Sequence, residues 1–518
     1  MKETSGLSLI KNSVITLFNS FFMMLFSWVI SIWIARQLGP TDYGVFSLVL
    51  WLSSTVSWVI GMGLIHSVTK FVAEYKGQDN DRNVTPVVLY VLKIEIAVSL
   101  LSTVLLLALK TQIADYFFSP NESLFISIAA LGLLPGMVTA IFSATIEGIQ
   151  KFEYFILSNL IISPLSFLAK AAVLLSGKGI TGLLYVMLFF SVINTIFYFL
   201  VLRHEGLFTK DQAVPLDKSI RRRIMQYNRS VIAILLCDKI VWDKSENFFL
   251  GRFCTSGEIA FYNLGFNVAQ RFMSILPNTF WRVLFPAMSS YSGSGDHEKM
   301  RRLFFLSTRY LAFVTFPVGI GGMILAYQII HFLYGHEYIG AQRVLQIVFA
   351  TSIISTLSNP ASAVLYGFEK HAFIYKFGAI LAVMNIVLDI IIIKRFGATG
   401  AACCYGFTTI LGSTGGLFYT CRLMKLQYPF VPVLKIMLST IIMGTVMETI
   451  IMQNGEIPGF IISIAAGCLT YVVCALVLCT PEEEDYRLLQ SVKNVSPRFL
   501  HGVVDGACGL LREFKSER

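Results

Sequence analysis

Long apolar runs separated by short polar breaks are the feature of this sequence that most limits its fold. Each run has about 20 residues, the length with which an α-helix crosses the hydrocarbon core of a bilayer. Of the 518 residues, 55% are hydrophobic and 14% are charged, against about 25% charged residues in soluble domains. So few charges cannot cover a water-facing surface of this size. The sequence therefore predicts an all-α integral membrane protein.

Polar, glycine and proline breaks divide the apolar residues into about fourteen predicted transmembrane helices. Six belong to an N-lobe, residues 1–202, and six to a C-lobe, residues 230–425, with two more helices in residues 426–480. Residues 203–229 are predicted to form a basic cytoplasmic linker. The predicted spans are 13–35, 45–67, 87–109, 123–146, 156–176, 180–202, 230–251, 260–285, 303–325, 341–365, 372–393, 399–421, 433–452 and 460–480.

The distribution of basic residues predicts the orientation, because cytoplasmic segments retain lysine and arginine. If the N-terminus is cytoplasmic, the inside segments carry 27 of the 41 basic residues and the outside segments carry seven. We therefore expect a multi-pass protein of the cell membrane with both termini in the cytoplasm. The net charge of +10 is then a property of its cytoplasmic segments, and no nucleic-acid partner is predicted.

Residues 481–518 form a predicted cytoplasmic tail. Apolar side chains recur in it at helical spacing from Leu500 to Phe514. This pattern predicts an amphipathic helix on the inner leaflet, with a disordered tail as the alternative.

The nine cysteines all lie in the C-terminal half, mostly inside apolar runs. No pair has the CxxC spacing that metal ligands and redox pairs commonly show. They are therefore interpreted as small packing residues. The sequence predicts no metal site and no cofactor.

Three local patterns of the first half recur in the same order in the second half, at a nearly constant offset, and this recurrence predicts an internal duplication. Two parallel six-helix repeats around a central cavity are typical of alternating-access transporters, although a channel is also compatible with a duplication. The matching pairs are 35–48 with 251–264, 144–151 with 363–370, and 179–182 with 397–400.

Two predicted spans carry a stripe of polar and basic side chains on one helical face, which must contact water or protein rather than lipid. Arginine binds phosphate in a planar, bidentate manner, so the stripes predict a cationic cavity for a phosphate-bearing ligand. For Arg282 and Arg309, near helix ends, snorkelling toward head groups is the alternative. Residues 260–285 carry Asn263, Asn267, Arg271, Ser274, Asn278 and Arg282, and residues 156–176 carry Asn159, Ser163, Ser166 and Lys170. The predicted substrate-binding residues are Arg271, Lys170, Lys93, Arg282, Asn267, Asn278, Ser274, Ser163 and Ser166.

Acidic residues inside the predicted spans are candidates for ion coupling, because a carboxylate in the membrane can exchange protons or sodium. These candidates are Asp238, Asp243, Glu246 and Glu95. Lys239 and Lys244 are crowded among the first three, so structural ion pairing is an equally strong alternative there. Asp389 and Glu448 are interpreted as structural groups, to which no role is assigned.

Three segments resemble signatures of the Wzx-type oligosaccharide flippases of polysaccharide biosynthesis, in the multidrug/oligosaccharidyl-lipid/polysaccharide exporter superfamily. The resemblance extends over residues 8–425. It implies a V-shaped, two-lobe helical bundle that moves lipid-diphosphate-linked sugars from the inner to the outer leaflet. Where family members commonly have asparagine this chain has Asp389, so the resemblance implies no role there. The segments are Ile34-Ala-Arg-Gln-Leu-Gly-Pro-Thr-Asp-Tyr-Gly44, Phe249–Phe253 with Glu258–Leu264 and Leu284–Pro286, and Asn385–Asp389 with Phe396–Ala402.

The predicted function is therefore that of a flippase, not an enzyme. It would move a lipid-diphosphate-linked oligosaccharide by alternating access during cell-surface polysaccharide biosynthesis. The expected partners are this substrate, membrane lipids, a coupling proton or sodium ion, and polysaccharide assembly enzymes.

Other functions remain as alternatives. An ion-coupled multidrug or small-molecule exporter of the same superfamily should favour carboxylates in its cavity, whereas the two stripes carry only basic charges. None of these residues distinguishes the predicted function from that of a flippase for lipid-linked peptidoglycan precursors. A membrane-embedded polymerase or glycosyltransferase should show a sizeable outside loop or a carboxylate-rich catalytic segment, and neither is visible. A pure scaffold would not maintain so many charges inside its spans.

Overall fold

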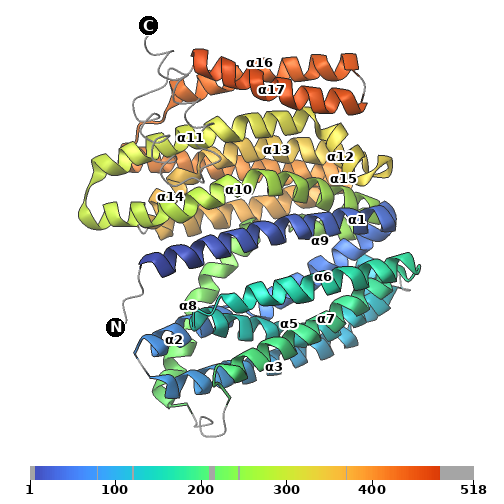
Figure 1. The fold of residues 1–518 in the computed structure, drawn as a ribbon, viewed down its shortest axis with the longest axis vertical. Helices are drawn as coiled ribbons and strands as arrows, with labels where there is room; N and C mark the ends of the chain where they lie inside the picture. The colour runs from blue at the N-terminus through green and yellow to red at the C-terminus, as the bar shows by residue number, and fades with distance from the viewer. Residues whose placement is uncertain are drawn as a thin grey trace. The chain divides into compact units, whose positions relative to one another are not determined.

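The computed structural model describes the chain as helices joined by short turns, and the described residues contain no strand. The described residues are 6–78, 80–118, 122–208, 216–242, 245–368, 370–454 and 456–478. Their α-helices are α1 (Gly6–Ile60), α2 (Leu64–Gly77), α3 (Val84–Ala108), α4 (Lys110–Phe117), α5 (Ser123–Gly148), α6 (Glu153–Leu175), α7 (Gly179–His204), α8 (Lys218–Trp242), α9 (Glu246–Phe253), α10 (Ser256–Ser294), α11 (His297–Ile324), α12 (Ala326–Tyr334), α13 (Ala341–Leu357), α14 (Asn359–Gly367), α15 (His371–Met424), α16 (Phe430–Asn454) and α17 (Glu456–Leu478). Figure 1 shows them coloured along the chain.

Nine helices in the described residues are long and apolar enough to cross a membrane, or ten if the bent pair α13–α14 is one span. Two of the nine, α1 and α15, each contain two helices joined at a non-helical glycine, Gly39 or Gly397. The less apolar α8–α9 and α10 occupy the predicted spans 230–251 and 260–285. A helix or half-helix thus coincides with each predicted span. The prediction of an all-α integral membrane protein with about fourteen spans is confirmed.

Glycine makes the two breaks possible, because both positions have positive φ angles that other residues rarely adopt. Gly39 has φ 72°, and Pro40, whose missing N–H costs nothing in the first turn of a helix, starts the next helix. Gly397 has φ 55°. Without these turns α1 and α15 would be too long for one bilayer crossing.

The helices of the second half repeat those of the first at a nearly constant offset, as the sequence patterns predict. The ends of α3 and α11 and the starts of α4 and α12 correspond, as do the ends of α5 and α14. The starts of α6 and α15 also correspond, and Gly179 between α6 and α7 matches Gly397 inside α15. Helices α16 and α17 follow the second repeat as an addition.

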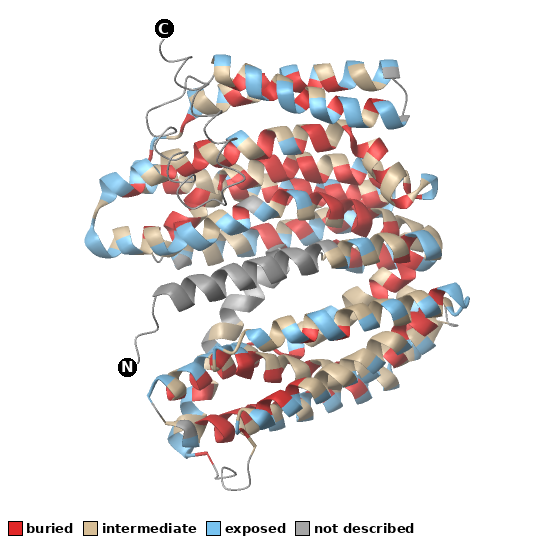
Figure 2. Cartoon of the chain, viewed as in Figure 1, coloured by how far each residue is buried: buried red, intermediate tan, exposed pale blue. Residues whose placement is uncertain are grey.

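The chain divides into two compact units, each with its own interior. Unit 1 contains Met1–Asn263, Leu333–Tyr338 and Ala382–Ala401, and unit 2 contains the remaining residues. In unit 1, α5 packs against α2, α3 and α7, and α6 packs against α7. Buried residues line the inward faces of these helices (Figure 2).

Apolar side chains on the outer faces of unit 1 are exposed, as expected of a surface that contacts lipid rather than water. Leu101 and Val104 of α3 are 69% and 61% exposed, and Leu160 of α6 and Phe189 of α7 are similarly exposed. These faces cannot remain in water, so they agree with a multi-pass membrane protein.

Helix α8 begins at Lys218, before the predicted start of its span at residue 230. Its first turns therefore lie in the segment predicted as a basic linker. They pack onto unit 1 because Ile220 and Ile224 recur at helical spacing, and Ile224 is fully buried in the apolar cluster of α2, α3 and α5. Arg223 also donates two hydrogen bonds to the Glu74 carboxylate of α2, at 2.6 and 2.9 Å.

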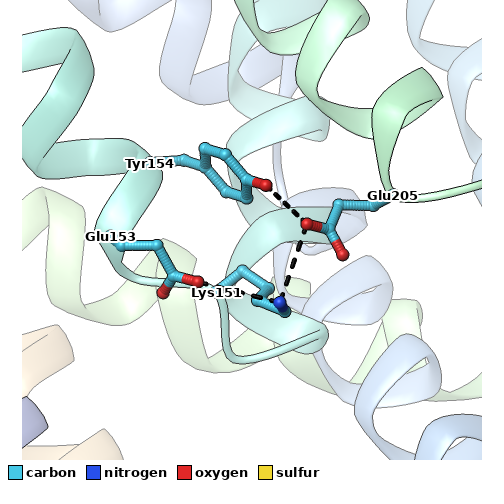
Figure 3. Close-up of polar contacts among 4 residues, drawn as sticks. All are labelled: Lys151, Glu153, Tyr154 and Glu205. Carbon is cyan, nitrogen blue, oxygen red and sulfur yellow. Dashed lines mark hydrogen bonds and ion pairs between the residues drawn. The ribbon is translucent and has the colours of Figure 1, made fainter.

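A second polar contact joins the turn before α6 to the end of α7 (Figure 3). Tyr154 donates a hydrogen bond of 2.5 Å to Glu205, and the Lys151 ammonium lies 3.7 Å from the same carboxylate. Lys151 also lies 3.8 Å from Glu153. These contacts fix one end of the α6–α7 hairpin.

In unit 2, α11 packs against α13 and α16, and α16 packs against α17. Met443, Met447 and Tyr471 form a buried apolar cluster there with Leu325. The Tyr471 hydroxyl donates a hydrogen bond of 2.5 Å to the carbonyl of Phe313. The two added helices therefore belong to the core of unit 2. The tail, residues 481–518, lies outside the described residues, so its amphipathic helix stays a prediction.

Gly44 of α1 allows α1 to approach the first residue of α10, and this contact generates a prediction. A Cβ atom at Gly44 would overlap the Ser256 carbonyl oxygen, whereas a Cβ atom at Gly416 of α15 would meet nothing within 4 Å. We expect Gly44→Ala to destabilise the protein by about 1–3 kcal/mol through overpacking. Thermal unfolding of the purified protein in detergent measures this.

Gly416→Ala is the matched control. It also replaces a helical glycine by alanine, and we expect an unchanged or slightly higher melting temperature. Equal melting temperatures for Gly44→Ala and the wild type would contradict the close approach of Gly44 and Ser256.

Candidate functional site

Buried polar side chains meet inside unit 1, where α9, the first turns of α10 and the middle of α15 contact one another. We call this group the carboxylate cluster; it consists of Ser245, Glu246, Tyr262, Asn385 and Asp389. Its two acids, Glu246 and Asp389, are 3% and 0% exposed. Two carboxyl groups thus lie inside the interior of a membrane protein.

A single amide connects the two acids. The Asn385 side-chain nitrogen donates to Ser245 Oγ at 3.0 Å and to Asp389 Oδ2 at 3.2 Å, and it lies 3.5 Å from Glu246 Oε1. The Tyr262 hydroxyl donates to Glu246 Oε2 at 3.0 Å. Asn385 and Asp389 are four residues apart on α15, so both side chains point to the same side of that helix.

Neighbouring contacts hold these helices in place. Asn247 and Asn263 exchange side-chain hydrogen bonds of 2.7 and 3.3 Å between α9 and α10. The Glu258 carboxylate accepts a hydrogen bond of 2.6 Å from the backbone N–H of Ala398, directly after the break at Gly397. A Cβ atom at residue 397 would overlap that carboxylate. The φ angle therefore favours glycine there, and the absence of a side chain leaves room for Glu258.

The electrostatics of the carboxylate cluster require a positive partner. Two carboxylates that share one site in a low-dielectric interior cannot both remain charged without compensation. A proton, a bound cation or a basic side chain can supply it. Carboxylate, hydroxyl and amide oxygens are also ligands for hard cations. Lys239 and Lys244 lie outside the described side chains. A basic side chain, a proton or a small cation can each fill this role.

The carboxylate cluster is not reproduced in the other repeat. At the offset that relates the repeats, Glu246, Asn385 and Asp389 correspond to Ile30, Phe167 and Ala171. The Phe167 ring instead contacts the rings of Phe26 and Trp33, at 5.8 and 6.1 Å between centroids. The equivalent place in the first half is therefore apolar.

Among the predicted ion-coupling residues, Glu246 lies in the carboxylate cluster. Glu95 is fully buried on α3, whereas Asp238 and Asp243 lie outside the described side chains. From the sequence, Asp389 is interpreted as a structural group, and neither Asn385 nor Tyr262 is predicted to be a site residue. The spacing of Asn385 and Asp389, four residues apart in an apolar span, was the available signal. The ion-coupling role itself stays a prediction.

The polar stripe on α10 changes in exposure along the helix. Asn267, Arg271 and Ser274 are half-buried, and Asn278 and Arg282 are exposed. The first member, Asn263, pairs with Asn247 in unit 1, and the later members belong to unit 2. The stripe thus offers basic and amide groups on one face. Its role in substrate binding stays a prediction.

The remaining predicted residues lie in unit 1. Ser163, Ser166 and Lys170 are half-buried on one side of α6. Lys93 is exposed on α3 and shares its helical face with Leu100 and Val104, which are 47% and 61% exposed. That face is otherwise apolar, which matches snorkelling better than a polar cavity. No contact joins Lys93 to Lys170 in the described residues, and both assignments stay predictions.

Comparisons with other sequences identify relatives. An uncharacterised membrane protein of the cps region of Klebsiella pneumoniae is 27% identical over 24% of this chain and 25% of its own length. A putative O-antigen transporter of Shigella flexneri is 22% identical over 78% of this chain and 96% of its length. A probable flippase, AglR, of Haloferax volcanii is 21% identical over 89% and 94%. The chain thus spans a quarter of the first relative and nearly all of the other two.

Solved structures share the fold. The lipid II flippase MurJ in an inward closed conformation has a TM-score of 0.73 at 15% identity, over 90% of this chain and 98% of MurJ. A multidrug resistance MATE transporter in an inward-facing conformation has a TM-score of 0.62 at 14% identity, over 77% of this chain and 94% of its own. At these identities the likeness concerns the fold alone.

One family model, described as polysaccharide biosynthesis protein, matches residues 32–343, which is more than half of the chain. The match begins in α1 and ends in α13, so it includes α9 and α10, which carry Glu246, Tyr262 and the polar stripe. The chain therefore belongs to this family of polysaccharide biosynthesis proteins.

Proposed function

We propose that this protein is a flippase that moves a lipid-diphosphate-linked oligosaccharide from the inner to the outer leaflet of the cell membrane. It acts by alternating access during the biosynthesis of a cell-surface polysaccharide. The family, the relatives named as transporter and flippase, and the fold of two related lobes support this proposal. The single observation that carries it is the polar stripe on α10.

The stripe fits the chemistry of such a substrate. The diphosphate needs positive charge, and the guanidinium of Arg271 supplies it in planar, bidentate form. The sugar hydroxyls need hydrogen-bond donors and acceptors, which Asn267, Ser274 and Asn278 supply. The lipid tail needs neither and stays in the bilayer. Lys170, with Ser163 and Ser166, offers the same combination on α6.

Orientation and partners complete the proposal. The protein is a transporter rather than an enzyme, and it lies in the cytoplasmic membrane with both termini inside, as the distribution of basic residues favours. Enzymes that assemble the oligosaccharide on the cytoplasmic side and polymerise it outside are the partners that this role requires.

The carboxylate cluster is the proposed coupling site of the flippase. Exchange of the positive partner of Glu246 and Asp389 for a proton or a sodium ion changes the charge of this buried site and thereby stabilises one conformation. Because occupancy of the cluster changes that conformational balance, an ion gradient can drive the transport cycle.

Removing the charge of Arg271 or Lys170 tests the substrate site. In a strain whose own copy of the gene is deleted, we expect Arg271→Ala to reduce export of the surface polysaccharide at least tenfold. The reason is that a charge-assisted hydrogen bond contributes about 1.5–3 kcal/mol. Lys170→Ala should reduce export in the same direction. Surface polysaccharide and accumulated lipid-linked oligosaccharide are measured at matched protein levels.

Lys178→Ala, in the exposed turn between α6 and α7, is the control and should export normally. Normal export by Arg271→Ala and Lys170→Ala together would refute the cationic site. Unchanged polysaccharide in the deletion strain, with lost efflux of a cationic dye, would favour the drug exporter. Accumulation of a peptidoglycan precursor would favour the flippase for that lipid.

Neutralising the carboxylate cluster tests coupling. We expect Glu246→Gln and Asp389→Asn to abolish the dependence of export on a pH or sodium gradient, because neither variant can exchange its positive partner. Export in membrane vesicles with an imposed gradient is the measurement, and Glu147→Gln, at an exposed position of α5, is the control. A gradient dependence equal to that of the wild type in both variants would rule out coupling at this cluster.

A further inference from the structure

Glu95 of α3 is a buried acid of unit 1 outside the carboxylate cluster. Its side chain is fully buried, and neither carboxyl oxygen has a hydrogen-bond partner among the described residues. Ser99, one turn further along the same helix, is also fully buried, and its hydroxyl likewise has no partner in that part of the chain. Three unsatisfied oxygen atoms therefore lie on one side of α3, although buried polar groups are almost always hydrogen-bonded.

The two side chains lie in the contact between α3 and α5. At one end of this contact the Thr103 hydroxyl donates a hydrogen bond of 3.1 Å to the carbonyl of Ala130. At the other end Val91 and Ile141 belong to one apolar cluster. Glu95 and Ser99 occupy the two helical turns between Val91 and Thr103. They are therefore enclosed by an apolar part of the bundle.

Among the described residues, no charged side chain of α2, α4 or α5 is buried as Glu95 is. Lys93 is exposed and points about 200° around the helix from Glu95. The titratable groups with described side chains on α1–α5, α7, α8 and the adjoining short turn are Arg36, Asp42, Tyr43, His66, Lys70, Glu74, Tyr75, Lys76, Arg82, Tyr90, Lys93, Lys110, Asp115, Tyr116, Glu122, Glu147, Tyr185, Tyr198, Arg203, His204, Lys218, Arg221, Arg222, Arg223, Tyr227 and Arg229. None of them is recorded in a hydrogen bond or ion pair with Glu95.

This environment determines the protonation of Glu95. An ionised carboxylate without a partner is strongly unfavourable in such an interior, and the neutral acid is much less so. The neutral, protonated acid is therefore the favoured form of Glu95 in the described conformation. If a change of conformation admits water between α3 and α5, its O–H bond breaks, the proton passes to water as hydronium and the carboxylate is hydrated. The reverse step returns the proton and closes the contact.

We propose that Glu95, together with Ser99, is a proton-carrying site of unit 1 that releases and rebinds a proton as the protein changes conformation. The protonation of Glu95 stands on the geometry alone. Its use in driving transport rests on the proposed flippase function. The site is separate in sequence and in contacts from the carboxylate cluster, so the chain has two places at which an ion can act.

Thermal unfolding of the purified full-length protein, without substrate, tests the protonation. The folded protein holds a proton on Glu95 that the unfolded chain loses at neutral pH, so wild-type stability should fall as the pH rises from mildly acidic to mildly alkaline. Glu95→Gln copies the neutral acid and should flatten this fall, whereas Glu147→Gln should follow the wild type. An unchanged slope in Glu95→Gln would overturn the proposal.

Infrared spectroscopy of the same samples gives a direct second readout. The wild type should show the carbonyl band of buried protonated carboxyl groups, and Glu95→Gln should lose the part of it that Glu95 contributes. If that band is equal in the two proteins, Glu95 is not the protonated group. If sodium stabilises the wild type more than potassium does at fixed pH, and Glu95→Gln abolishes this difference, then Glu95 binds a metal cation rather than a proton. That result would also overturn the proposal.

Export in the deletion strain tests the coupling. We expect Glu95→Gln to fold and yet to lower surface polysaccharide at least tenfold, and Ser99→Ala to lower it less. Normal export by Glu95→Gln would refute the coupling role. If the wild type itself fails to restore the polysaccharide, the proposed function fails, while the unfolding and infrared measurements still decide whether Glu95 carries a proton.

Discussion

The cost of leaving a polar group unsatisfied in the hydrocarbon core is the constraint on which this structure depends. It makes the backbone helical wherever the chain crosses the membrane, because only internal hydrogen bonds are available there. The same cost makes each buried ionisable side chain informative. Glu246 and Asp389 share the amide of Asn385, and Glu95 has no described partner.

The internal duplication gives both halves of the chain the same order of helices. The buried ionisable residues are where the two halves differ. Both repeats break at equivalent turns, for example at Gly179 and Gly397, so the architecture is shared. The chemical character of the buried side chains differs between the repeats. The second repeat contributes the acids of the carboxylate cluster, and the first has Phe167 packed on Phe26 and Trp33 in the equivalent place. Glu95, conversely, corresponds to Leu311 of α11 at the offset of 216 that relates the ends of these two helices. Each repeat thus has a buried acid where the other has an apolar residue.

The sequence alone predicts the helices well, because span length and apolar content are local properties. It does not predict the helical turns of α8 before residue 230, since the charged residues after Lys218 conceal the apolar spacing of Ile220 and Ile224. It also leaves Asp389 unassigned, because its neighbour Glu246 is distant in the chain and only the fold brings their helices together. Similarly, the sequence shows Glu95 inside a span but cannot show that its carboxyl oxygens have no hydrogen-bond partner among the described residues.

The central claim is that this protein transfers a lipid-linked oligosaccharide between leaflets. The most direct measurement is the distribution of that lipid across the cytoplasmic membrane after the protein is depleted, read with a membrane-impermeant sugar-modifying reagent. The account predicts that the intermediate accumulates on the cytoplasmic face and disappears from the outer face. An unchanged distribution after depletion would contradict it.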